Sequence, residues 1–283
     1  MTLQYKTQSL DTHIDIELLQ FQGLRNFSTC QRADLVRGLT QGCLEICSIG
    51  IRHQYPKASL SQTRWEFARR TLGEEIANKF YNYYKEDERP LIIPDPIGLA
   101  LEVADILDNI GIPYLVGGSL ASSLLGEPRS TADLDFVADL SPELVSTFVE
   151  AIAPDFYVSE SAVREAIAGQ SSFNILHQAT MSKVDIFILK NQPLERSEFQ
   201  RRRAVAVRED PERSLFLPTA EDIILQKLIW YRLGREISDR QWRDILGVLK
   251  LQGNTLDFGY LWQWAEELKL LDLLERALGE SGL

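Results

Sequence analysis

The sequence predicts an α+β fold in which a small mixed β-sheet core is flanked by helical N-terminal and C-terminal regions. Apolar residues recur at helical spacing in residues 1–90 and again after residue 211, whereas short apolar runs of strand length lie between these regions. A segment with three prolines in seven residues, from Pro90 to Pro96, is incompatible with a helix interior and indicates a linker. We therefore expect a helical region 1–90, a core 91–210 and a helical region 211–283.

Each region contains elements that the sequence predicts individually. In the N-terminal region, a helix is expected over residues 59–84, with Ser59 or Ser61 as its N-cap. In the core, Asp95-Pro96 begins a helix that Gly111 ends. The elements expected after it are a strand 114–116, a short helix 117–126, a strand 133–138, a helix 142–153 and a hairpin of strands 173–177 and 184–189.

The C-terminal region is expected to consist of three helices. Thr219 is placed to cap a helix that continues through Leu233, and Ser238 to cap a second helix through Leu249. A third helix is expected over residues 261–278. We also expect this region to complete the functional site.

Composition favours a folded cytoplasmic protein. Hydrophobic residues make up 45% and charged residues 25% of the chain, and no apolar run approaches the roughly 18 residues of a membrane span. The N-terminus lacks the apolar segment of a signal peptide. The three cysteines, Cys30, Cys43 and Cys47, are too few for a disulfide framework and indicate a reducing compartment. We expect no membrane partner.

The formal net charge of −11 opposes the binding of a long polyanion unless basic residues are clustered. Residues 91–209 carry 9 basic and 17 acidic groups, so the acidic excess is concentrated where a cation site would lie. Residues 190–208 are an exception, because this stretch contains six basic residues and only two acidic ones. This basic stretch either guides an RNA end or forms a solvated helix face.

The stretch from residue 114 to 138 has the features of a phosphate site. Gly117 and Gly118 lack Cβ atoms, so the backbone there can approach a triphosphate closely. Ser119 lies at the expected helix N-terminus, where unpaired N–H groups and the helix dipole favour an anion. A tight turn and a simple N-cap are the alternatives for these three residues.

Three aspartates in the expected strands are candidate metal ligands. Asp133 and Asp135 are two residues apart, so both carboxylates leave the same face of a strand and repel each other unless a cation lies between them. Asp185 is the lone acid in an otherwise apolar strand. Mg²⁺ prefers such oxygen ligands, and two ions would clamp the oxygens of an in-line displacement. For Asp185 the alternative is a salt bridge to Lys183 or Arg129.

A Gly-Gly-Ser turn, an Asp-x-Asp pair about a dozen residues later and a later single aspartate resemble the DNA polymerase β-type nucleotidyltransferase superfamily. Residues 125–136 are similar to its bacterial abortive-infection branch, the AbiEii-like toxins. The resemblance covers about residues 95–250 and matches Lys227 and Asp244 to a lysine and an aspartate in successive later helices. It implies a toxin–antitoxin or phage-defence role, NTP as substrate and Mg²⁺ as cofactor.

The resemblance assigns catalytic roles to Asp133, Asp135, Asp185, Lys227 and Asp244. Lys227 would also contact nucleotide phosphate, with a lysine that snorkels to solvent as the alternative. Asp244 is explained equally by a helix-surface pair with Arg240 or Arg243. Arg129 either binds phosphate or caps the turn before the Asp-x-Asp pair.

The acceptor and the role of residues 1–90 stay open at this point. The acceptor is an RNA 3′ end, a protein hydroxyl or a small molecule, and the sequence does not choose among the NTPs. A non-catalytic nucleotide-binding module with a partner-binding N-terminal region is the second functional hypothesis. Residues 1–90 are a regulator or a homodimer arm, because the apolar helix face around Trp65, Phe67 and Leu72 must be buried against something.

Overall fold

The computed structural model describes residues 5–84 and 90–283 and divides into two compact units. Unit 1 comprises Met1–Leu35, Leu115–Arg129 and Asn191–Leu283, and unit 2 comprises Val36–Tyr114 and Ser130–Lys190. Each unit is built from segments that alternate along the chain, so the units cut across the three regions expected from the sequence. The units are described separately below.

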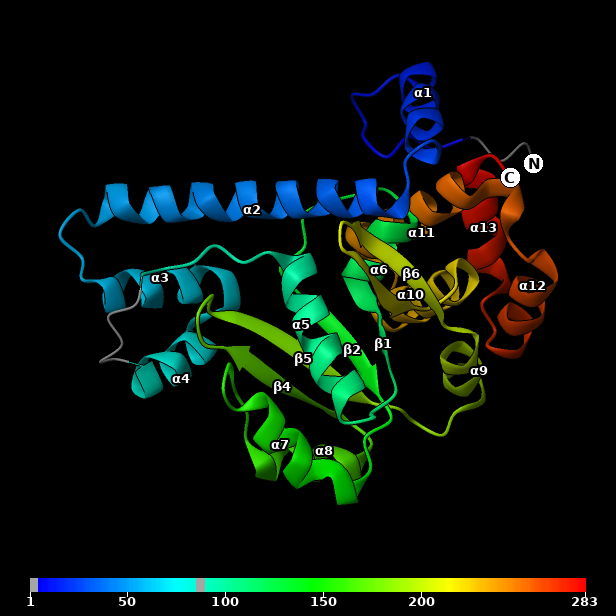
Figure 1. The fold of residues 1–283 in the computed structure, drawn as a ribbon. Coiled ribbons are helices and arrows are strands. Elements are labelled where there is room, and N and C mark those ends of the chain that lie inside the picture. The colour runs from blue at the N-terminus through cyan, green and yellow to red at the C-terminus, as the bar shows by residue number, and fades with distance from the viewer. Residues whose placement is uncertain (1–4, 85–89) are drawn as a thin grey trace. The chain divides into compact units, whose positions relative to one another are not determined.

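Unit 2 contains a mixed sheet, which confirms the predicted fold class (Figure 1). The strand order is β1-β2-β5-β4-β3, and the division between the units falls within β1, after Tyr114. β2 and β5 are parallel, whereas β4 is antiparallel to both β5 and β3, so the predicted β4–β5 hairpin is confirmed. The strands are β1 (Tyr114–Val116), β2 (Leu134–Ala138), β3 (Phe156–Tyr157), β4 (Ser172–His177) and β5 (Ser182–Ile188).

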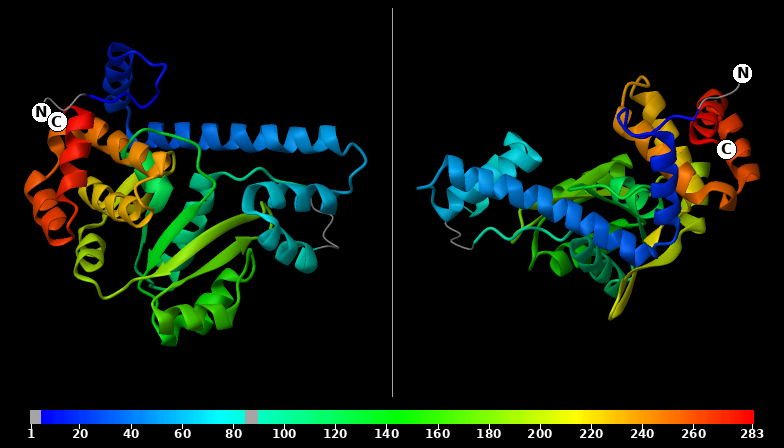
Figure 2. Two further views of the ribbon diagram at one scale, coloured as in Figure 1. Left: turned by 180° about the vertical axis from the view of Figure 1, so that it is seen from behind. Right: turned by 90° about the horizontal axis from the view of Figure 1, so that it is seen from above.

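Helices bury one face of this sheet. Alternate side chains of β2 and β5 are buried, and Phe136 of β2 packs against the Tyr114 ring. α5 (Pro96–Asn109) lies against the sheet in opposite views of the molecule (Figures 1 and 2). It begins at the predicted Asp95 cap. α8 (Glu160–Gly169) packs on β4 and β5, and α7 (Val145–Ile152) follows a short 3₁₀ turn at Pro142–Leu144.

Unit 2 also contains three successive helices, namely α2 (Thr29–Gln54), α3 (Leu60–Leu72) and α4 (Glu74–Tyr84). The first residues of α2 belong to unit 1. Ser59, one of the two caps considered from the sequence, caps α3 through a capping box with Gln62. The single helix expected over residues 59–84 is wrong, because the chain breaks at Gly73, whose φ of +89° suits glycine. The helices α2–α4 share a core with the β4–β5 hairpin, formed by Leu44, Ile51, Phe67, Ala68, Ala77, Leu176 and Met181.

Unit 1 is mainly helical. The predicted caps Thr219 and Ser238 start α10 and α11. The single helix expected over residues 261–278 is wrong, since the chain turns between α12 and α13 with Lys269 at a φ of +59°. The elements are α1 (Ile14–Arg25), α6 (Gly118–Leu125), α9 (Pro193–Arg201), the hairpin β6 (Arg203–Glu209) and β7 (Glu212–Leu217), α10 (Ala220–Leu233), α11 (Asp239–Gln252), η2 (Gly253–Thr255), α12 (Phe258–Glu267) and α13 (Leu271–Ser281).

Two further features concern the described residues of both units. Among residues 5–84 and 90–283, no helix is both long enough and apolar enough to cross a membrane. Cys30, Cys43 and Cys47 all lie within the described residues and are free thiols.

Candidate functional site

The N-terminus of α6 in unit 1 has the local structure expected of an anion site. Gly118 adopts a φ of +57°, in the left-handed region that glycine reaches without strain. In the described part of the chain, no side-chain oxygen caps α6 at Gly117. The opposite end is satisfied, because Arg32 Nε donates to the Leu124 carbonyl at 2.7 Å and Gln252 Nε2 to the Leu125 carbonyl at 2.6 Å. The helix dipole thus presents its positive end at the glycines.

Arg129 is held beside this helix end by two points of contact with Asp244. Its Nε donates to Asp244 Oδ1 at 2.7 Å and its Nη2 to Oδ2 at 2.8 Å, a two-point geometry that fixes the plane of the guanidinium. Nη2 also donates to Ser119 Oγ at 3.0 Å. Arg129 therefore links the first turn of α6 to α11. A role limited to capping the turn before the Asp-x-Asp pair does not account for these contacts.

Lys227 joins the same cluster from α10. Its Nζ donates to Asp244 Oδ2 at 2.8 Å, and the two residues are only 6% and 7% exposed. The ammonium group therefore does not reach into solvent as a snorkelling lysine would. Ser122 Oγ also donates to Asp244 Oδ2, at 3.4 Å. Asp244 is bound by partners from α6, α10 and the segment before β2.

The electrostatics of Asp244 follow from these contacts. Burial alone would raise the pKa of Asp244, but hydrogen bonds from Arg129 and the charge of Lys227 outweigh it and hold the pKa below its usual value. The carboxylate is thus ionised between two cations. Arg243, one of the two partners considered from the sequence, instead binds Glu127 at 3.0 and 3.1 Å.

In unit 2 the sheet places two of the predicted aspartates side by side. Asp135 of β2 lies directly opposite Asp185 of β5 in the parallel register, so both side chains leave the same face about 5 Å apart. Asn174 of β4 is opposite Asp185 on that face. Asp133 is exposed and lies one residue before β2 begins. The face opposite the buried one is therefore polar at the centre of the sheet.

Lys183 neutralises one of these carboxylates. Its Nζ donates to Asp185 Oδ2 at 2.5 Å, and the two side chains are 20% and 21% exposed. This is the salt bridge that the sequence offered as the alternative to a metal role for Asp185. Since Lys183 is two residues from Asp185 on the same strand, it shares the polar face.

Mg²⁺ fits these residues in donor type. Across residues 5–84 and 90–283, no group of three or more His, Cys, Asp or Glu side chains is gathered for a metal ion. Mg²⁺ usually takes one or two carboxylates and completes its shell with water and substrate phosphates. The adjacent carboxylates of Asp135 and Asp185 meet that need, whereas Asp133 lies outside the paired strands.

Part of the basic stretch 190–208 has a structural role. Arg201 binds Glu221 and Asp222, each at 3.3 Å, and stacks 3.8 Å from the centre of the Tyr260 ring. Arg202 lies 4.2 Å from the Phe199 ring centre. Arg201 therefore fastens α9 to α10 and α12, whereas Arg202 packs on a ring of α9 itself, and neither sequence-based interpretation included these roles. The stretch spans a helix and a strand rather than one helix face.

No protein-family model and no curated protein matches the sequence. Several solved structures resemble it, among them two at low identity. An antigenic nucleotidyltransferase-like protein from Paracoccidioides brasiliensis is 18% identical, covers 65% of this chain and 93% of its own, and gives a TM-score of 0.42. The antibiotic-resistance factor ANT(2'')-Ia is 12% identical, with coverage of 64% and 98% and a TM-score of 0.37. Similarity this weak carries no argument, so the chemistry below depends on the chain's own residues.

Proposed function

We propose that this protein is a Mg²⁺-dependent nucleotidyltransferase that moves a nucleoside monophosphate from an NTP to an acceptor hydroxyl. The observation that carries the proposal is the cluster of Arg129, Lys227 and Asp244 beside Ser119, at a helix end that presents backbone N–H groups. Two cations that share one carboxylate, next to the positive end of a helix dipole, favour a polyanionic ligand. The paired carboxylates of unit 2 supply the second requirement, a cation-binding face.

Each group has a role in the proposed reaction. The N–H groups of Gly118 and Ser119 and the ammonium of Lys227 bind triphosphate oxygens, while Asp244 keeps Arg129 and Lys227 in position. Asp133, Asp135 and Asp185 would hold Mg²⁺, which would supply charge neutralisation to the phosphates. Asp185 orients the attacking hydroxyl and accepts its proton. The new bond forms at the α-phosphorus as the bond to pyrophosphate breaks, so positioning and charge compensation provide most of the rate enhancement.

The acceptor in this proposal is an RNA 3′ end or a protein hydroxyl. The resemblance of residues 125–136 to AbiEii-like toxins extends the proposal to a toxin–antitoxin or phage-defence setting. α2–α4 would then serve as a regulatory or homodimer surface, since Ile46 and Ile49 of α2 are exposed by 72% and 63%.

A second candidate is a nucleotide-binding module without catalysis. The contact of Lys183 with Asp185 favours it, because a lysine that already neutralises a carboxylate competes with a metal ion. In this version the cluster of Arg129, Lys227 and Asp244 still binds nucleotide, and the polar sheet face of unit 2 binds no metal.

One experiment separates the two candidates. The protein is incubated with each α-³²P-labelled NTP, Mg²⁺ and total cell extract, and labelled macromolecules are resolved with and without nuclease or protease treatment. Label that depends on Mg²⁺ and disappears with Asp135→Asn supports the transferase. If nucleotide binds in calorimetry but no macromolecule is labelled with any NTP, the transferase proposal fails and the binding module stands.

A further inference from the structure

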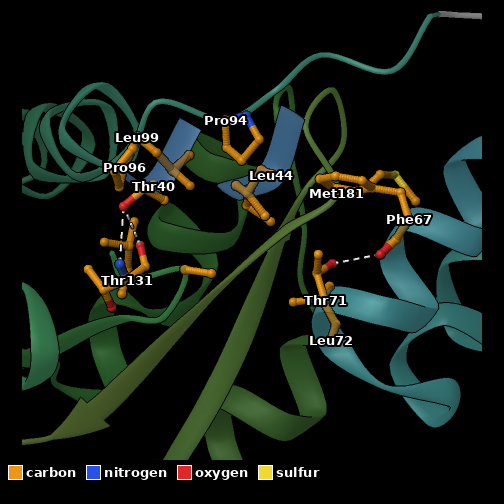
Figure 3. A pocket seen from close by; sticks show the side chains of 13 residues that line it. Thr40, Leu44, Phe67, Thr71, Leu72, Pro94, Pro96, Leu99, Thr131 and Met181 are labelled. Carbon is orange, nitrogen blue, oxygen red and sulfur yellow. Dashed lines mark hydrogen bonds between the residues drawn. The ribbon is translucent and has the colours of Figure 1, made fainter. Parts of the chain in front are cut away.

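Thr40 of α2 makes an unusual contact with the segment that leads into β2. Its Oγ1 accepts from the Thr131 backbone N–H at 3.1 Å and donates to the Thr131 carbonyl at 3.4 Å (Figure 3). Both residues are buried, at 1% and 5% exposure. One hydroxyl therefore bonds both the backbone N–H and the backbone carbonyl of Thr131, which lies outside any strand or helix. Loss of that hydroxyl would leave a buried donor and a buried acceptor without this bond.

Thr131 in turn contacts the first aspartate of the Asp-x-Asp pair. Its Oγ1 donates to the Asp133 carbonyl at 3.2 Å. The ladder between β2 and β5 begins one residue later, where Leu134 is opposite Val184. The sheet thus fixes Asp135 directly. Asp133 is instead held through two hydroxyl groups in series, that of Thr40 on α2 and that of Thr131.

We infer that Thr40 is a positioning residue for Asp133, acting through Thr131, so that the helices α2–α4 contribute to the metal-binding face. The inference rests on the proposed function, because it assumes that Asp133 binds the cation. It gives residues 36–84 a role that neither a regulator nor a dimer arm requires, namely to hold one metal ligand in place from within the same compact unit.

The surroundings of Thr40 explain why its hydroxyl matters for position. A cavity of about 20 Å³ lies beside it, lined by residues that include Leu44, Phe67, Leu134 and Met181, and it has room for about one water molecule. If the bond to Thr40 is lost, this cavity gives residues 131–132 space into which they can shift. Ala132 lines the same cavity and precedes Asp133 directly.

The cavity also offers a matched control. Thr71 of α3 lines it too, but its hydroxyl donates to the Phe67 carbonyl of its own helix at 2.8 Å (Figure 3). Thr40→Val and Thr71→Val remove a hydroxyl from the same cavity at nearly constant shape. Only the first removes a bond to the segment before β2. Thr40→Ser keeps the hydroxyl and is the rescue variant.

The test uses the full chain and Mn²⁺ as the probe metal. Mn²⁺ affinity is measured by electron paramagnetic resonance, and hydrogen–deuterium exchange is followed in peptides that cover residues 129–135. We expect Thr40→Val to weaken Mn²⁺ binding about fivefold, the equivalent of one lost hydrogen bond, and to speed exchange in these peptides without metal. Thr71→Val and Thr40→Ser should behave as wild type. In an Asp133→Asn background, Thr40→Val should cause no further loss of affinity.

The outcomes separate the inference from the proposed function. If wild type binds Mn²⁺ and Asp135→Asn does not, but Thr40→Val and Thr71→Val are indistinguishable in affinity and exchange, the positioning role is wrong while the metal site stands. A Thr40→Val defect that persists undiminished with Asp133→Asn overturns the inference too. If wild type does not bind Mn²⁺, the metal part of the proposed function fails first, and faster exchange alone then assigns Thr40 to structure.

Discussion

Arg129 and Asp244 are 115 residues apart in the sequence, yet they form a two-point ion pair with distances of 2.7 and 2.8 Å. The pair brings the segment before β2 and the helix α11 together at the first turn of α6. Lys227 completes it from α10, so four segments of unit 1 meet at one carboxylate. The consequences of removing that carboxylate can be stated separately for folding and for nucleotide binding.

Asp244→Asn should destabilise the protein by about 3–5 kcal/mol, because it leaves the buried Lys227 without a compensating charge. Urea denaturation monitored by circular dichroism measures the change. The double variant Asp244→Asn with Lys227→Met should lose less stability than the sum of the two single variants, since no buried lysine then remains unpaired. Strictly additive losses would contradict the coupling.

Lys227→Met should weaken NTP binding by about 1.5–3 kcal/mol, the worth of a charge-assisted hydrogen bond, while its aliphatic chain still fills the buried site. Isothermal titration with each NTP provides the affinities. The control is Lys79→Met, which removes an exposed lysine of α4 paired with Glu75. Equal affinities for wild type and Lys227→Met would assign Lys227 to structure alone.

The contacts around Asp244 show how far the sequence predicts which residues meet. The sequence singles out Gly117, Gly118 and Ser119 because each residue type has a local property that suits phosphate, and Gly118 does adopt the left-handed backbone. Arg129 remained ambiguous between phosphate and a turn. For Asp244 the sequence offers only Arg240 and Arg243, neighbours on its own helix, because sequence spacing gives no information about a contact across 115 residues.

The elements of the fold divide in the same way. The sequence predicts the helix starts at Asp95, Thr219 and Ser238, and Ser59 is one of the two caps that it offers for α3, because capping is a local hydrogen bond. Two helices were predicted too long, since their apolar period continues across the turns at Gly73 and Lys269. The role of Thr40 had no sequence signal, because its partners belong to a loop 91 residues later.

Asp135→Asn should abolish nucleotidyl transfer and leave the fold intact. Asp135 is opposite Asp185 in the register, so the substitution also relieves repulsion between adjacent carboxylates and should keep or raise the melting temperature in metal-free buffer. Added Mg²⁺ with NTP should raise the melting temperature of wild type but not of the variant. Label transfer and thermal denaturation are the two measurements, and transfer retained by the variant would remove the metal mechanism.

Glu198 makes the stability of unit 1 depend on pH. This residue of α9 is 7% exposed and accepts a 2.8 Å hydrogen bond from Gln226 Nε2. Burial raises its pKa to about 8, against the lowering effect of the Gln226 bond, and the nearby charge of Asp222 raises it further. The folded protein therefore keeps a proton at Glu198 that the unfolded chain releases near its ordinary pKa of 4.5.

The sign of the pH effect follows from this proton. Between pH 4.5 and about 8 the native state binds more protons than the unfolded state, so the free energy of unfolding should fall as pH rises, by on the order of 4 kcal/mol across the window. Glu198→Gln mimics the protonated acid and should remove this contribution, so that the variant exceeds wild type most at pH 8. Urea unfolding at intervals of pH measures both slopes, with Glu266→Gln, an exposed residue of α12, as the control. Parallel curves for wild type and Glu198→Gln would mean that Glu198 is ionised in the folded protein and that its burial is compensated by a cation.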